Sequence, residues 1–436
     1  MPASIEAPRA PASGRPALLK NRVFARMFAA YSLAVLGDWF DAIAVQVLIV
    51  YRWGASPMQI ALVPVCMAVP GILLGTAAGM AADRFDRLKL MRICDLLTAF
   101  VTLLILLAPG IYWLLPLLAL RAALGVFNMP AQQAQTRRVV REDQLLEATS
   151  LNGLVGQLSR IAGPLLGAAV LAAFSPQACL LLNAAARFAS YGLLRSIRAA
   201  ADAAALAAGR SVRPEAAAEA AGEERPGFAR LLREGWTFVR GSRPLLSTLL
   251  FSLAGMLVIQ LVDYQFVGLF RFLAPESEGA IGWLLAASGL SAIAALFALN
   301  RAPLLKKAGY GVKIGIGYAL IGLSIGWLGL LPAGTGPGAI LAAGLLLGFG
   351  NGLVMITLNY GLQKETPPRM TGRVFGIQNT LLSAVMIAAP LLGGLLVERF
   401  GPGPVFGLAG LFVLLLGLAG LGFGRLLWPR PPESEH

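Results

Sequence analysis

Two aspartates lie inside a run of the sequence that is otherwise apolar. The run is LGDWFDAIAVQVLIVY, from Leu36 to Tyr51, and it contains Asp38 and Asp41. A charge at the centre of a membrane-spanning helix costs roughly 2.5–3.5 kcal/mol, whereas each Leu or Ile returns only about 0.3–0.6 kcal/mol. Acids in such a place are therefore candidates for binding a proton, a cation or an arginine.

Other ionisable residues also fall near the middle of apolar segments, namely Arg121, Arg160, Arg187 and Asp263. Three acids and three arginines balance formally, so structural ion pairs are one interpretation. A polar cavity is the other, and we expect Asp38, Asp41, Arg121 and Asp263 to bind a proton or substrate there, with Arg160 and Arg187 as further lining candidates. Asp38 and Asp41 are three residues apart and share a helical face. Because a desolvated carboxylate near a like charge holds its proton more tightly, one of them could exchange a proton.

Aromatic residues beside these acids are candidates for lining the same cavity. Trp39 follows Asp38, and Tyr264 follows Asp263. They suit an amphipathic compound, although aromatic residues in apolar helices more often serve packing. The sequence has one histidine, at position 436, and its three cysteines stand singly, so neither a metal site nor a cofactor is predicted.

The elements that position these residues follow from composition. The chain of 436 residues is 57% hydrophobic and 13% charged, and its apolar runs repeatedly reach the length of about 20 residues that a membrane-spanning helix needs. The net charge of +14 comes from short basic clusters between these runs, which indicates orientation in a membrane rather than nucleic-acid binding. The sequence therefore predicts an all-α integral membrane protein.

About twelve spans are predicted, in two sets of six. They are 23–51, 57–80, 91–109, 112–130, 147–173 and 177–198, followed by 244–271, 279–300, 311–331, 338–362, 374–397 and 402–427. The corresponding domains are a disordered tail (1–22), a six-helix bundle (23–198), a linker with an interfacial helix (199–243), a second bundle (244–428) and a tail (429–436). Because Lys and Arg gather in alternate loops, both termini and the linker are predicted to be cytoplasmic.

An internal repeat relates the two sets. IAGPLLGA (161–168) and IAAPLLGG (387–394) are offset by 226 residues, and Asp38-Trp39 has a near counterpart in Asp263-Tyr264. Two halves related by duplication are typical of transporters that bind substrate between the halves and rock about that site.

Three motifs resemble those of the major facilitator superfamily. They are GMAADRFDRLK (79–89), RAALG (121–125) and SRIAGPLLGA (159–168). Four residues within them differ from those usual in the family, namely Asp86, Leu124, Ser159 and Ala168. The stretches 127–154 and 367–381 are similar to the branch of macrolide and siderophore exporters. The resemblance implies the major facilitator fold of two pseudo-symmetric bundles, and it does not identify the substrate.

The motifs also have a physical interpretation. Asp83 could accept hydrogen bonds at a neighbouring helix N-terminus, and the basic residues of its loop could pair with acids or lipid phosphate, forming a conformational gate. The gate residues are Gly79, Asp83, Arg84, Arg87 and Lys89. The helix motif resembling that of antiporters comprises Gly163, Pro164, Gly167, Pro390 and Gly393, which permit a kink or close helix contact. Ordinary basic loops and plain packing are the alternatives.

We expect a monomeric secondary transporter of the bacterial inner membrane that exports small amphipathic molecules in exchange for protons. In this hypothesis a proton on a first-helix carboxylate weakens its pairing with Arg121 or with substrate. The alternatives are export of a siderophore, metal ion or lysophospholipid with the first-helix acids as ligands, or a sensor without transport. An enzyme is not expected, since no Ser/His pairing is available, and the ATP-binding pattern G-x-x-x-x-G-K-[ST] is absent.

Overall fold

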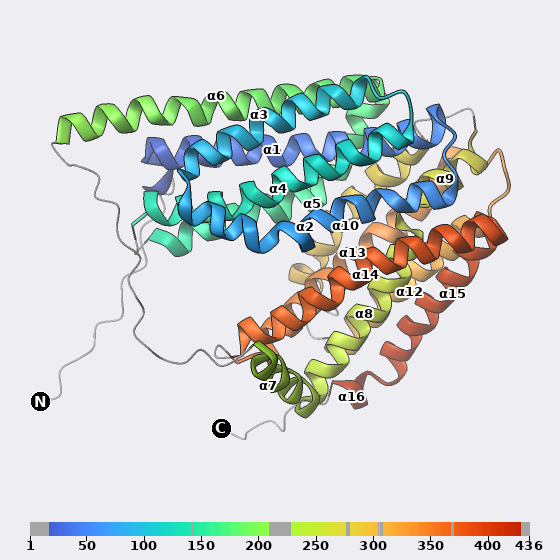
Figure 1. Ribbon diagram of the computed structural model, residues 1–436. Coiled ribbons are helices and arrows are strands. Elements are labelled where there is room, and N and C mark those ends of the chain that lie inside the picture. The colour runs from blue at the N-terminus through green and yellow to red at the C-terminus, as the bar shows by residue number, and fades with distance from the viewer. Residues whose placement is uncertain are drawn as a thin grey trace, which may run out of the picture.

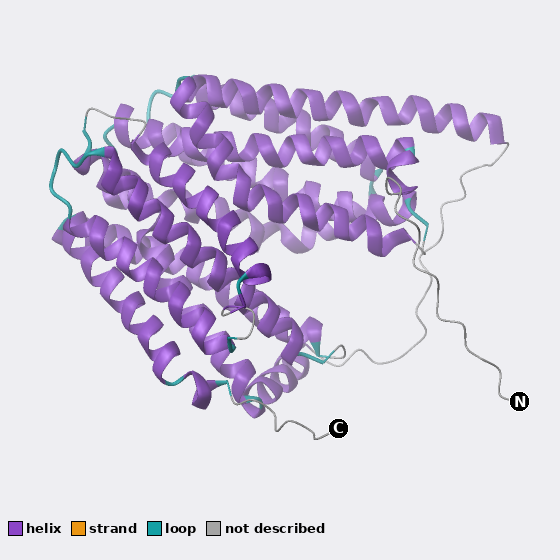
Figure 2. Ribbon diagram, turned by 180° about the vertical axis from the view of Figure 1, so that it is seen from behind, coloured by secondary structure: helices purple, strands orange, loops and turns teal. Residues whose placement is uncertain are grey.

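The computed structural model describes residues 17–141, 144–208, 228–275, 280–303, 305, 308–367 and 370–428. All regular structure in these residues is helical (Figure 2). Most of the tail predicted for 1–22, much of the predicted linker and all of the predicted tail 429–436 lie outside the described residues. Residues Ala17–Lys20 form a short 3-10 turn, η1, in which Leu18 is buried.

Six long helices form the first half of the molecule (Figure 1). They are α1 (Arg22–Val47), α2 (Pro57–Arg84), α3 (Arg87–Leu106), α4 (Ile111–Val139), α5 (Leu145–Ala173) and α6 (Pro176–Ala208). A π-helical turn, η2 (Leu48–Arg52), continues α1. Helix α6 extends ten residues beyond the predicted end of its span at 198.

The second half repeats this arrangement with shorter additional pieces. Its helices are α8 (Arg243–Asp263), α9 (Phe266–Leu273), α10 (Ala280–Arg301), α12 (Tyr310–Leu330), α13 (Pro337–Glu365), α14 (Thr371–Phe400), α15 (Pro402–Gly422) and α16 (Gly424–Leu427). The predicted continuous span 244–271 is interrupted after Asp263, where α8 ends and α9 begins three residues later. Helix α7 (Phe228–Gly241) occupies the position predicted for the interfacial helix and packs against α8 and α14.

Nine helices in the described residues are long and apolar enough to cross a membrane. Helices α3, α5 and α6 are also 20 or more residues long but are not among these nine. All three contain acidic, basic or amide residues in their interior, such as Asp95 in α3, Asn152 in α5 and Arg187 in α6. Polar residues within helices of this length indicate a site inside the bundle.

The two halves touch at one end of the molecule and separate toward the other (Figure 1). We call the second end, where α2 turns into α3 at Arg84–Arg87 and where α4 ends with Arg137 and Arg138, the basic end. At the opposite end, Gly394 of α14 lies against Pro57 and Ala61 of α2. Toward the basic end the same two helices present glycines, Gly79 and Gly376, with open space beside them. The structure is therefore open at the basic end.

Candidate functional site

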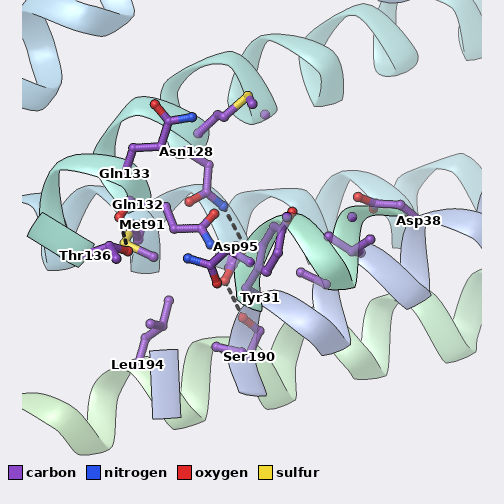
Figure 3. Close-up of a pocket in the computed structure, with 18 of the residues that line it drawn as sticks. Tyr31, Asp38, Met91, Asp95, Asn128, Gln132, Gln133, Thr136, Ser190 and Leu194 are labelled. Carbon is purple, nitrogen blue, oxygen red and sulfur yellow. Dashed lines mark hydrogen bonds between the residues drawn. The ribbon is translucent and has the colours of Figure 1, made fainter. Parts of the chain in front are cut away.

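A charged cluster joins three helices of the first half. Arg187 of α6 donates from one terminal nitrogen to both carboxylate oxygens of Asp38 in α1, at 2.6 and 2.7 Å. Its other terminal nitrogen donates to Asp95 of α3 at 2.9 Å. Asp95 also accepts hydrogen bonds from Ser190 Oγ (2.6 Å) and Asn128 Nδ2 (3.1 Å), as Figure 3 shows. One guanidinium is thus shared by two carboxylates.

The two carboxylates of this cluster differ in their access to solvent. The side chain of Asp95 is 3% exposed, whereas that of Asp38 is 46% exposed. Both line a cavity of about 580 Å³ within the first half, together with Tyr31, Asn128 and Arg187. We call this the first-half cavity. Water that enters this cavity can reach Asp38, whereas Asp95 is buried and accepts hydrogen bonds from three side chains.

A second ion pair lies on the same helix as Asp38 but is closed to solvent. Asp41 is fully buried and pairs with Arg121 of α4, which is 10% exposed. The sequence-based expectation that a first-helix carboxylate pairs with Arg121 is met by Asp41 rather than by Asp38. Residues three apart on an α-helix differ in direction by about 60°, which is enough to point Asp38 at α6 and Asp41 at α4.

Another cavity, of about 590 Å³, lies between the halves. Four residues of α1, among them Trp39 and Gln46, line one side, and residues of α8, α9, α10, α12 and α13 line the rest. Asp263 is exposed to this inter-half cavity and makes no ion pair or hydrogen bond with the described residues. The other polar groups include the side-chain amides of Gln46, Asn351 and Asn359.

Two predicted lining residues are not placed in these cavities. Tyr264 is partly buried against the main hydrophobic core and is absent from the residues that line either cavity. The side chain of Arg160 is not among the described parts of the chain.

Comparison with known proteins decides the family. The model of the Major Facilitator Superfamily matches residues 27–390. The chain belongs to the major facilitator superfamily. An uncharacterized MFS-type transporter of Bacillus subtilis (strain 168), YfiS, is 27% identical over 409 residues, which are 93% of this chain and 94% of that protein. Macrolide efflux protein A of Streptococcus pyogenes is 23% identical over 83% of this chain and 86% of its own length.

Solved structures confirm the fold of this superfamily member. The nucleoside transporter NupG superposes with a TM-score of 0.65 at 12% sequence identity, covering 93% of this chain and 99% of that one. The chain is therefore a multi-pass membrane transporter of the major facilitator type, with the all-α fold predicted from its sequence.

The glycines of the helix motif allow neighbouring helices to pack closely. A Cβ atom on Gly163 of α5 would collide with the indole ring of Trp39, and one on Gly167 would collide with Ile43 in α1. In the second half, a Cβ on Gly393 of α14 would collide with the main-chain carbonyl of Leu261 in α8. The repeated glycines thus bring the fifth helix of each half against the first. Pro164 and Pro390 lie within the same helices, α5 and α14.

The loop motif is exposed in this open structure. Asp86, rather than Asp83, accepts a hydrogen bond at a helix N-terminus, from the main-chain nitrogen of Lys89 at 3.1 Å. Arg87 donates to the carbonyl oxygen of Ala82 at 3.2 Å. Asp83 and Arg84 are exposed to solvent, so any gate that they form belongs to another conformation.

Sequence reasoning missed Asp95 and its partners Ser190 and Asn128. Asp95 lies only nine residues after Asp86, close to the basic segment KLMR, and there it resembles the edge of a loop. The available signal was the position of Asp95 within the apolar run CDLLTAFVTLLIL, because an acid inside a membrane-spanning helix raises the free energy of insertion.

Proposed function

We propose that this transporter exports small amphipathic molecules in exchange for protons by alternating access. In this proposal it lies in the bacterial inner membrane with the basic end, both termini and the linker in the cytoplasm. The distribution of Lys and Arg supports this orientation. The relative named macrolide efflux protein A supports the direction of transport.

The observation that carries the proposal is the sharing of Arg187 by Asp38 and Asp95. Two carboxylates and one guanidinium leave one excess negative charge in a low-dielectric bundle, which favours the binding of one proton. Asp38 is the proposed proton site because its side chain is 46% exposed to the first-half cavity. The buried Asp95 keeps its bond to Arg187 throughout.

Protonation would change how the first helix is held. A neutral Asp38 loses the charge that attracts Arg187, so α1 is released from α6 while α3 and α6 stay joined through Asp95. Because α1 also lines the inter-half cavity through Trp39, its movement reaches a substrate bound there. In this arrangement Asp38 is coupled to Arg187, while the pairing with Arg121 expected of a first-helix carboxylate belongs to Asp41.

The alternative in which both first-helix acids bind a metal ion is less favoured by the contacts. Asp41 is paired with Arg121 and Asp38 with Arg187, so each carboxylate already faces an arginine, and the two arginines lie on different helices. Siderophore and lysophospholipid export share the same fold and are separated by the choice of substrate in the test.

The test is proton flux coupled to substrate in proteoliposomes. Purified protein is reconstituted, a pH gradient is imposed, and proton movement is followed on adding a macrolide, a siderophore or a lysophospholipid. Asp38→Asn is expected to abolish substrate-dependent proton flux, whereas the control Glu398→Gln, an exposed acid on α14, is expected to retain it. Undiminished coupled flux in Asp38→Asn would overturn the assignment.

A further inference from the structure

Asp263 occupies an electrostatically uncompensated position. It is exposed to the inter-half cavity, and no basic side chain is among the residues that line that cavity. None of the described residues forms an ion pair or hydrogen bond with it. Asp263 is the last residue of α8, and the C-terminal end of a helix carries partial negative charge, so the helix adds no compensation.

The rest of the lining is suited to an apolar ligand with a few polar groups. Trp39 and Phe266 present aromatic surface, and Leu284, Ile321 and Met355 are among the aliphatic or thioether groups. Aromatic faces attract organic cations, most strongly those of Trp. The volume of about 590 Å³ lies in the range of small-molecule sites, which are mostly apolar with few convergent polar groups.

The inter-half cavity contrasts with the first-half cavity. The first-half cavity is lined by Arg187, which neutralises one of the two negative charges of Asp38 and Asp95. The residues that line the inter-half cavity include no basic side chain, so a cation must come from outside the chain to neutralise Asp263. An anionic ligand would add a second negative charge beside Asp263 and is disfavoured by repulsion.

We propose that the inter-half cavity binds amphipathic organic monocations, with Asp263 as the counter-ion, Trp39 as the aromatic wall contributed by the other half, and the amides of Gln46 and Asn351 as hydrogen-bonding groups. This inference names the substrate class of the proposed exporter. It rests on the proposed function only in calling the bound cation a substrate, because binding of the cation does not itself require transport. Because Trp39 and Asp263 belong to different halves, a cation bound between them contacts both halves.

The experiment measures binding without any gradient. Tetraphenylphosphonium is titrated into purified protein in detergent micelles, and tetraphenylborate, an anion of closely similar size and shape, is titrated separately. The wild-type protein is expected to bind the cation saturably and to show no saturable binding of the anion. Equal binding of the two ions would overturn the proposal without requiring any variant.

Variants then locate the charge. Asp263→Asn is expected to weaken tetraphenylphosphonium binding roughly 30-fold or more, as for truncation of one partner of a charge pair, and Asp263→Glu is expected to retain most of the affinity. Glu398→Gln serves as the matched control, since it removes an exposed acid outside both cavities. Unchanged cation affinity in a folded Asp263→Asn protein would overturn the inference.

This result is independent of the proton-coupling assay. If Asp263→Asn abolishes cation binding while Asp38→Asn retains coupled flux, the cation site stands and the proton site is misassigned. If Asp38→Asn loses coupled flux and Asp263→Asn binds the cation normally, the transport proposal stands and the cation site is refuted.

Discussion

Arg187 holds Asp38 through a single guanidinium nitrogen that lies 2.6 and 2.7 Å from the two carboxylate oxygens. The same arginine uses its other terminal nitrogen for Asp95, so α1, α3 and α6 meet at one side chain. The position of α1 is therefore tied to the protonation and pairing state of this cluster.

Replacement of Arg187 by Gln is expected to destabilise the protein strongly. Asp95, which is 3% exposed, would keep hydrogen bonds from Ser190 and Asn128 but lose its only cationic partner in the described residues. Breaking a buried pair on one side typically costs about 3–5 kcal/mol in the free energy of unfolding. Denaturant or thermal unfolding in detergent measures the change, with Arg399→Gln on the exposed end of α14 as the control.

A second substitution separates charge from shape in the same cluster. Adding Asp95→Asn to Arg187→Gln removes the stranded charge and should restore part of the lost stability. If Arg187→Gln alone proves as stable as the parent protein, the cluster does not hold the helices together.

The buried pair of Asp41 and Arg121 is expected to be structural. Asp41→Asn leaves Arg121, 10% exposed, without its anion and should lower stability, whereas the double variant Asp41→Leu with Arg121→Met should recover it. Because neither group lines the first-half or inter-half cavity, the double variant is also expected to retain transport. Stability without transport in that variant would instead give the pair a functional role.

The sequence predicted the helices more completely than their contacts. Apolar run length determines where a membrane helix can lie, so nine of the twelve predicted spans have direct counterparts in single helices, each starting within four residues of its predicted start. The exceptions are the ends of the first, seventh and twelfth spans, and the twelfth is divided into α15 and α16. Neither the π-helical turn at Leu48–Arg52 nor the break after Asp263 is marked by Gly or Pro, so backbone-breaking residues gave no signal there.

Charge pairing was harder to predict because it depends on which helix faces meet. Asp38 and Asp41 share a side of α1 by spacing alone, yet their partners lie on different helices, α6 and α4. Arg187 was expected only as a further lining candidate, but the structure makes it the centre of the cluster. One sequence gives the position of each charge along its helix and leaves the rotation of that helix open.

Two glycines of α14 should respond oppositely to the same substitution. A Cβ on Gly393 meets the carbonyl of Leu261, so Gly393→Ala is expected to push α14 from α8 and lower stability by about 1–3 kcal/mol, as overpacking does. Gly376 faces open space, so Gly376→Ala is expected to be neutral or to stabilise by up to about 1 kcal/mol through helix propensity. Thermal unfolding of the two variants in one detergent makes the comparison. Equal losses would show that the close approach of α14 and α8 carries no stability.

Arg271 is expected to hold the halves together at the end opposite the basic end. Its guanidinium, on α9, donates to the carbonyl oxygen of Val50 in the π-helical turn after α1, at 2.9 Å. A second cross-half bond, from Gln265 Nε2 to the carbonyl oxygen of Pro57 at 3.0 Å, lies near it. A hydrogen bond from a charged donor contributes about 1.5–3 kcal/mol, so Arg271→Ala should raise the population of the state open at this end roughly 10- to 100-fold.

Spin labels at the basic end report that shift. Met80 of α2 is exposed and Gly376 of α14 faces open space, so labelled cysteines there, in a background with Cys66, Cys94 and Cys179 replaced, should fit without disturbing packing. The distance distribution between them is expected to gain a shorter component in Arg271→Ala, because opening one end brings the other together. Gln177→Ala, on the same end but in the first half, is the control and should leave the distribution unchanged. An unaltered distribution in Arg271→Ala would mean that helix packing alone, through Gly394 against Pro57 and Ala61, keeps that end closed.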